Sequence, residues 1–269
     1  SWVYEGFAKT YQRIGVDFDK NYYESDTYIL GKKVVEIGLK KEVFYKKEDG
    51  SVWIDLSDKG LDEKLILRSD GTAVYMTQDI GTALQRQDDF DFSHMIYTVA
   101  NEQDYHFKVL FLILEKLGYK WASNCFHLSY GMVDLPTGRM KSREGTVVDA
   151  DELLRSVIDE AKSLTSERGF LEELTESEVY DICEKIGIAG LKYFLLKVDS
   201  KKKISFDPKE TIDLSGHTGP FIQYTFVRIK SLLNKVEIAE ADFNPEDVVL
   251  NVKELEVIKS ISNFPMIVM

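Results

Sequence analysis

Residues 95–118 read MIYTVANEQDYHFKVLFLILEKLG, and this stretch decides the fold class. The apolar run over 95–100 is typical of a buried strand, and a polar turn follows at 101–104. Over 105–117 the apolar positions recur with a helical period, and Gly118 indicates the end of this helix. A strand, a polar turn and a helix in this order build open α/β sheets, which place ligands at the carboxyl ends of their strands. We therefore expect an α/β fold with candidate binding residues in this turn.

The chain up to about residue 150 alternates short apolar runs with segments of helical periodicity. We expect a helix after Ser25 and Asp26, and another from about Thr72 to Arg86 with an N-cap in residues 69–71. Strands are expected over 43–47, 51–56, 65–67 and 127–133, the first two joined as a hairpin by the turn at 48–50.

Beyond residue 150 the pattern becomes helical. Asp149 or Asp151 offers the N-cap of a helix that runs to about Thr165. Further helices are expected over 177–196, over 220–235 with a proline in the first turn, and from about residue 252 onward. This half of the chain is interpreted as an incomplete helical bundle.

Composition limits the function classes. The chain has 269 residues, of which 44% are apolar, so it can bury a sizeable core in about two domains. Its formal net charge of −12 disfavours binding to nucleic acid through bulk electrostatics, and no DNA partner is expected. Val109–Leu114 is far too short an apolar run to span a bilayer. Cys125 and Cys183 form no CxxC pair and the histidines show no metal-ligand spacing, which favours a reducing cytoplasm and no structural metal.

The helix over 72–86 carries a pair of candidate binding residues. Tyr75 and Asp79 are four residues apart, so their side chains share one helical face. A carboxylate beside an aromatic face suits a guanidinium, which donates a forked pair of hydrogen bonds while the ring covers its plane. An ordinary exposed aspartate beside a half-buried tyrosine is the alternative interpretation. Gln103 and His106, in and after the turn at 101–104, are candidates for contacts with a polar or anionic ligand.

A basic loop runs from Asp134 to Gly145. It holds three cations, Arg139, Lys141 and Arg143, and has glycines that give its backbone freedom. Such a loop is suited to a polyphosphate, although a solvated basic turn has the same composition.

Four passages together resemble one family. They are LRSDGTAVYMTQDIG at 67–81, ANEQDYH at 100–106, LSYGMV at 128–133 with GTVV at 145–148, and GHTGPFIQYTFVR at 216–228. In order and spacing they are similar to the arginyl-tRNA synthetases, which are class I aminoacyl-tRNA synthetases. The resemblance implies a partial Rossmann-like parallel sheet with helices, followed by a helical-bundle domain.

The resemblance also implies roles for individual residues. Tyr75, Asp79 and Gln103 match positions that hold the substrate arginine, and His106 matches a motif histidine near the nucleotide. The loop that closes on the ATP phosphates would contain Met140, Lys141, Ser142 and Arg143. The residues that would contact tRNA are Gln223, Arg228 and Lys230.

The chain departs from the family pattern in two places. The loop reads Arg139-Met-Lys-Ser-Arg143, so Ser142 stands where KMSKS has its second lysine. No histidine has the neighbours of a His-x-Gly-His motif. We therefore expect a fragment: the C-terminal part of the catalytic domain over 1–150, a helical connecting region over 151–218 and the start of the anticodon-binding domain over 219–269.

The implied activity is that of an arginine–tRNA ligase. It would activate arginine with ATP and Mg²⁺ to arginyl-adenylate and transfer the arginine to tRNA, while the fragment alone would be inactive. Two alternatives remain open at this point: a non-catalytic module that binds tRNA or a partner, and a class I synthetase for another amino acid, with lysine as the competitor.

Overall fold

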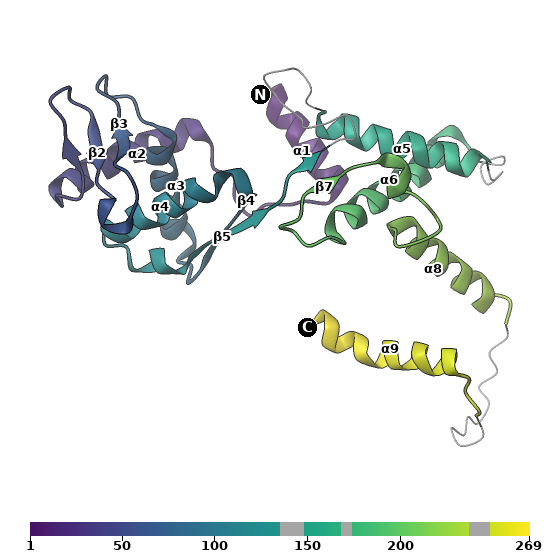
Figure 1. Cartoon of the computed structure of the whole chain (residues 1–269). Coiled ribbons are helices and arrows are strands. Elements are labelled where there is room, and N and C mark those ends of the chain that lie inside the picture. The colour runs from purple at the N-terminus through teal and green to yellow at the C-terminus, as the bar shows by residue number, and fades with distance from the viewer. Residues whose placement is uncertain (135–147, 168–173, 237–247) are drawn as a thin grey trace. The chain divides into compact units, whose positions relative to one another are not determined.

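The computed structural model describes residues 1–134, 148–167, 174–236 and 248–269. The chain divides into two compact units, Ser1–Gln223 and Tyr224–Met269 (Figure 1). Among the described residues, no helix has both the length and the apolar character needed to cross a membrane.

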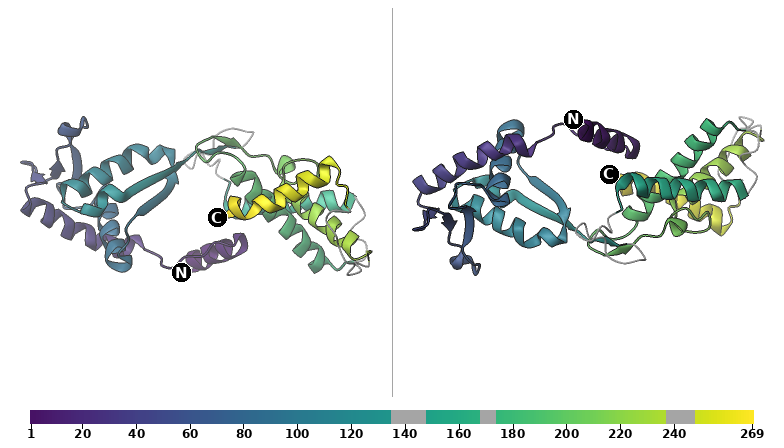
Figure 2. Two further views of the ribbon diagram at one scale, coloured as in Figure 1. Left: turned by 90° about the horizontal axis from the view of Figure 1, so that it is seen from below. Right: turned by 90° about the horizontal axis from the view of Figure 1, so that it is seen from above.

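The first half of the larger unit is an α/β structure. Its helices are α2 (Glu24–Lys40), α3 (Tyr75–Phe90) and α4 (Asp104–Lys116), and its strands are β1 (Tyr45–Lys46), β2 (Val52–Ile54), β3 (Lys64–Leu67), β4 (Met95–Ala100) and β5 (Cys125–Tyr130). Strands β1, β2 and β3 form an antiparallel sheet, whereas β4 and β5 pair in parallel from Met95 opposite Cys125 to Ala100 opposite Tyr130. Figure 2 shows this parallel pair from two further directions. The expected α/β class and the strand, turn and helix unit are confirmed.

Helix α4 supplies much of the core. Leu110, Ile113 and Leu114 are fully buried, together with Ile80 of α3 and Ile66 of β3. Their spacing along α4 places them on one stripe of the helix, which is the face that removes apolar surface from water. The turn before α4 is thereby held at the carboxyl end of β4.

Helices α2 and α3 approach one another closely. A Cβ atom on Gly31 would lie 2.8 Å from the backbone oxygen of Thr77, and one on Gly81 would lie 2.8 Å from the nitrogen of Gly31. Glycine at both positions therefore allows backbone contact between the two helices. This contact fixes the position of α3.

The second half of the larger unit is mainly helical. Its elements are β6 (Val133–Asp134), α5 (Ala150–Glu167), α6 (Glu176–Leu196), β7 (Ile204–Ser205), α7 (Pro208–Thr211) and the start of α8 (Gly219–Leu233). The Asp149 carboxylate accepts a hydrogen bond from the backbone of Glu152, which confirms one of the two expected caps. Thr175 and Glu178 form a capping box at the start of α6. The unit 224–269 holds the rest of α8 and α9 (Val252–Val268).

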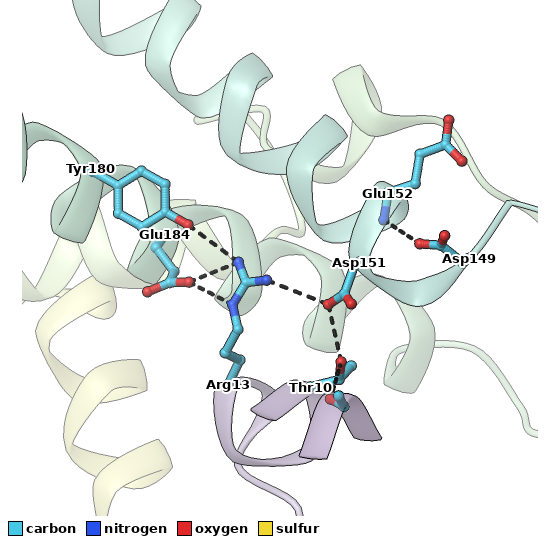
Figure 3. A network of polar contacts seen from close by, with 8 residues as sticks. Thr10, Arg13, Asp149, Asp151, Glu152, Tyr180 and Glu184 are labelled. Atoms are coloured by element: carbon cyan, nitrogen blue, oxygen red, sulfur yellow. Dashed lines mark hydrogen bonds and ion pairs between the residues drawn. The ribbon is translucent and has the colours of Figure 1, made fainter. Parts of the chain in front are cut away.

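The N-terminal helix α1 (Trp2–Ile14) is tied to α5 and α6 by polar side chains (Figure 3). The Arg13 guanidinium pairs with Glu184 at 2.9 Å and with Asp151 at 3.5 Å. It also donates to the Tyr180 hydroxyl at 3.4 Å, and Thr10 donates to Asp151 at 3.1 Å. Helix α1 has no buried residue, so these polar contacts attach it together with the packing of the partly buried Ile14 against the core of α5 and α6.

Two sequence predictions are wrong in detail. Helix α3 begins at Tyr75 and not at Thr72, because the Asp70 carboxylate accepts from the backbone and hydroxyl of Thr72 and forms a local turn. The strand expected over 127–133 is divided into β5 and β6. Gly131 lies against the backbone of Lys202 at this division, where its own N–H donates to Ser200.

Candidate functional site

The polar face of α3 meets the first turn of α4 at one side-chain contact, between His106 and Asp79. Nε2 of His106 lies 2.6 Å from Oδ2 of Asp79. The His106 side chain is 24% exposed and the Asp79 side chain 45% exposed, so the pair is partly covered and still open to a ligand. A partly desolvated carboxylate attracts a cation more strongly than a fully hydrated one. This pair is the centre of the candidate site.

Contacts on both sides of His106 hold the first turn of α4 in place. The buried Phe107 ring packs against the His127 ring at 4.4 Å and the Tyr97 ring at 4.8 Å. Nδ1 of His127 lies 3.2 Å from the Asp104 carboxylate, and Nε2 donates to the Val99 carbonyl at 2.9 Å. The turn is therefore joined to both strands of the parallel pair.

Two turns after Asp79 and one turn after Thr82, Arg86 extends the polar face of α3. Its guanidinium carbon lies 5.3 Å from the Tyr22 ring centre and 5.4 Å from that of Tyr97. Both distances are within the range of cation–π attraction. Burial raises the pKa of Tyr97 well above its ordinary value, and the nearby Arg86 charge opposes that rise only in part. Tyr97 therefore stays neutral beside Arg86.

The three predicted arginine-contacting residues occupy neighbouring elements. Asp79 lies in α3, Tyr75 is the first residue of the same helix with 79% exposure, and Gln103 is the exposed residue immediately before α4. Within the described ranges, no hydrogen bond or ion pair joins Tyr75 or Gln103 to Asp79. Their convergence on one ligand stays a prediction.

The predicted phosphate loop, Met140, Lys141, Ser142 and Arg143, lies outside the described residues. Immediately before it, Asp134 at the end of β6 pairs with Lys203. This pair, together with the parallel contact of β6 with β7, fixes the point from which the loop departs.

The predicted tRNA-contacting residues lie on α8. Gln223 donates to the Lys185 carbonyl at 3.3 Å. Further along the helix, the Arg228 guanidinium lies 5.7 Å from the Tyr224 ring centre, and the Lys230 ammonium lies 5.7 Å from that of Phe226. Both cations are exposed, and each lies one turn after an exposed aromatic side chain. Cations and rings arranged in this way can contact phosphates and unstacked bases.

Sequence reasoning missed the contacts that connect these residues. The helical spacing placed Tyr75 and Asp79 on one face, yet the pairing of Asp79 with His106 joins residues 27 positions apart. The Asp104 pair with His127 crosses from α4 to β5 in the same way. The one sequence signal for the pair of Asp104 with His127 was the position of a polar histidine inside an apolar strand pattern. Over the ranges that the structure describes, no group of three or more His, Cys, Asp or Glu side chains could hold a metal ion.

Comparison with known proteins gives a consistent result. The family model described as "tRNA synthetases class I (R), catalytic domain" matches residues 5–207. An arginine–tRNA ligase of Flavobacterium psychrophilum is 58% identical over 271 residues, which cover 99% of this chain and 44% of that protein. The ligase of Amoebophilus asiaticus is 55% identical, over 98% of this chain and 45% of its own length.

Solved structures agree in fold. The arginyl-tRNA synthetase of Thermus thermophilus has a TM-score of 0.72 at 21% identity, over 88% of this chain and 46% of that one. The Plasmodium falciparum enzyme has a TM-score of 0.74 at 19% identity, over 98% of this chain and 44% of its own. The chain spans somewhat less than half the length of the curated relatives it matches.

Proposed function

The chain belongs to the class I tRNA synthetase family whose catalytic domain its residues 5–207 match, and from this premise we propose that it is part of an arginine–tRNA ligase. The ligase would form arginyl-adenylate from arginine and ATP and then transfer arginine to the terminal ribose of tRNA. The single observation that carries the proposal is this family match, and the partly exposed Asp79 carboxylate beside α4 supports it. The expected location is the cytoplasm.

In this proposal Asp79 binds the guanidinium of the substrate. A carboxylate offers about four lone-pair sites, and a guanidinium presents its donors in a planar fork that fits two of them. Tyr75, one turn earlier on α3, would cover the plane of the cation, and Gln103 would bind a remaining polar group. Lysine cannot form the forked pair, so the geometry favours arginine over lysine.

The adenylation step requires charge stabilisation and positioning. The arginine carboxylate would attack the α-phosphorus of ATP, and pyrophosphate would leave with its magnesium. Lys141 and Arg143 are the cations of the loop from Met140 to Arg143 that would face the phosphates, with Ser142 as a further hydrogen-bonding group. No covalent bond to the protein is needed for this step.

Contact with tRNA is assigned to α8. Arg228 and Lys230 are the exposed cations there, with aromatic rings beside them, and Gln223 lies one turn earlier. A local patch of this kind can bind RNA although the whole chain carries a net charge of −12.

Calorimetric titration with arginine, lysine and citrulline tests the assignment of the amino acid. Citrulline has nearly the shape of arginine without its charge, so we expect it to bind at least about tenfold more weakly. Asp79→Asn should weaken arginine binding by roughly 10- to 100-fold, because it removes a charged hydrogen-bond partner. Asp181→Asn, an exposed change on α6, is the matched control. Equal affinity for arginine and citrulline would disprove the role of Asp79, and tighter binding of lysine would assign another amino acid.

A further inference from the structure

The contact between Asp79 and His106 has a defined direction. An ionised carboxylate can only accept hydrogen bonds, so at 2.6 Å the histidine donates from Nε2 to Oδ2. Donation to an ionised acceptor makes this a charge-assisted bond, stronger than one between neutral groups. One oxygen of Asp79 is therefore held in a fixed direction.

The histidine that makes this contact is itself held in place. It lies between Asp104, which pairs with His127, and Phe107, which is buried against the rings of His127 and Tyr97. Asp79 is held equally well on its side, because its neighbour Ile80 is fully buried. Both partners thus project from backbone that packing has already fixed, so little ordering is needed when a ligand arrives.

The bond to His106 leaves room for a second partner. It uses one of about four lone-pair sites on the carboxylate. The Asp79 side chain keeps 45% of its surface exposed, whereas His106 keeps only 24%. Oδ1 and the exposed side of Oδ2 can accept a forked donor at a lower entropic cost when the plane of the carboxylate is already fixed. A freely rotating carboxylate would lose side-chain entropy on forming the fork.

We propose that His106 is a positioning residue that fixes the Asp79 carboxylate for a guanidinium, and that it does not contact the nucleotide. The proposal rests on the proposed function, because it deepens the account of the arginine site. It assigns to His106 a role in amino-acid affinity that is separate from ATP binding. The hydrogen on Nε2 is the atom on which this role depends.

The test is a set of titrations of the whole chain with arginine, citrulline and ATP. His106→Phe keeps a ring but removes the donor, so arginine binding should weaken by about tenfold or more while citrulline and ATP binding stay within about threefold. His106→Gln should restore arginine binding to within about threefold, because its amide nitrogen reaches nearly as far as Nε2 and also donates. His94→Phe is the matched control, since His94 is an exposed histidine in the turn before β4.

The outcomes separate this inference from the proposed function. If Asp79→Asn abolishes arginine binding and His106→Phe leaves it unchanged, the positioning role is wrong and the arginine site stands. Weaker ATP binding by His106→Phe with unchanged arginine binding would instead make His106 a nucleotide contact. If the unchanged chain fails to bind arginine, both proposals fall. Side-chain nitrogen NMR gives an independent readout: a neutral His106 ring with its proton on Nε2 supports the inference, and one with its proton on Nδ1 overturns it.

Discussion

Among single residues, Cys125 at the start of β5 has a clear pH signature. Burial raises the pKa of its thiol to about 11, since the thiolate would lose its hydration. Its folded value lies above the unfolded one, so the thiol favours the fold below the ordinary thiol pKa of about 8.5, and this contribution is lost as the pH rises through 11. Alkylation of Cys125 by iodoacetamide, followed by peptide mass spectrometry, should reach half of its maximal rate only near pH 11 in the folded chain.

The control for this measurement is the same chain in concentrated guanidinium. There the alkylation of Cys125 should reach half of its maximal rate near the ordinary thiol pKa of about 8.5. Peptide mapping measures the alkylation of Cys125 and of Cys183 separately. The two must be distinguished because Cys183 is fully buried in α6. A folded-state profile for Cys125 that coincides with the denatured one would contradict the protection that we assign to its burial.

At the level of elements, the contact of α2 with α3 sets the position of Asp79. Gly31→Ala would place a methyl group 2.8 Å from the Thr77 carbonyl, so the helices must separate. We expect a loss of about 1–2 kcal/mol in the free energy of unfolding, measured with urea, because overpacking outweighs the gain in helix propensity. Gly6→Ala in α1 is the control: no described atom lies within 4 Å of its added Cβ, so it should be neutral or stabilising. Equal stability of the Gly31→Ala chain and the original would refute close packing.

The attachment of α1 is a second element that can be tested. Arg13→Met removes the charge that joins Glu184 and Asp151 but keeps an apolar stem of similar length. We expect faster amide hydrogen exchange throughout α1 with little change in α2, α3 and α4, because partly exposed ion pairs contribute only about 1 kcal/mol or less each. Arg155→Met, at an exposed position of α5, should leave exchange in α1 unchanged. If α1 exchanges equally in both variants, apolar contacts rather than Arg13 hold it.

The local sequence pattern predicted most of the helices and strands. It failed where contacts between distant segments determine the local structure. Helix α6 and the strand β4 have strong periodicity and were placed within about one residue. Helix α1 was not predicted, because its aromatic residues are exposed and its polar side chains bind side chains of α5 and α6. The start of α3 was placed too early, since a turn around Asp70 competes with capping.

For the candidate site, too, the sequence pattern predicted positions within one helix but not the contact between two helices. The spacing of Tyr75 and Asp79 correctly places them one turn apart on α3, since both positions depend only on the helix. The partner of Asp79 could not be predicted from spacing, because His106 belongs to α4 and reaches it only through the packing of the two helices. A resemblance to a family identifies such residues, and the structure gives the contact between them.

For the whole molecule, activity depends on how much of the synthetase is present. The chain spans 44% of the Flavobacterium psychrophilum ligase and contains no His-x-Gly-His motif. We expect the chain alone to catalyse arginine-dependent exchange of pyrophosphate into ATP at least about a thousandfold more slowly than that ligase, because groups that stabilise the phosphates are lacking. Replacing the matched segment of the ligase with this chain should restore exchange to within about tenfold of the parent, since 58% of the matched residues are identical.

Asp79→Ala in this chimera should abolish exchange while the protein still binds tRNA, because the proposed function assigns the amino acid to Asp79 of α3 and the tRNA to α8. The matched control in the same chimera is Asp181→Ala, an exposed change on α6 that should leave exchange unchanged. Exchange by the isolated chain at the rate of the chimera would contradict the expected inactivity. A folded chimera that binds tRNA and yet performs no exchange would contradict the assignment of this chain to the arginine-activating part of the ligase.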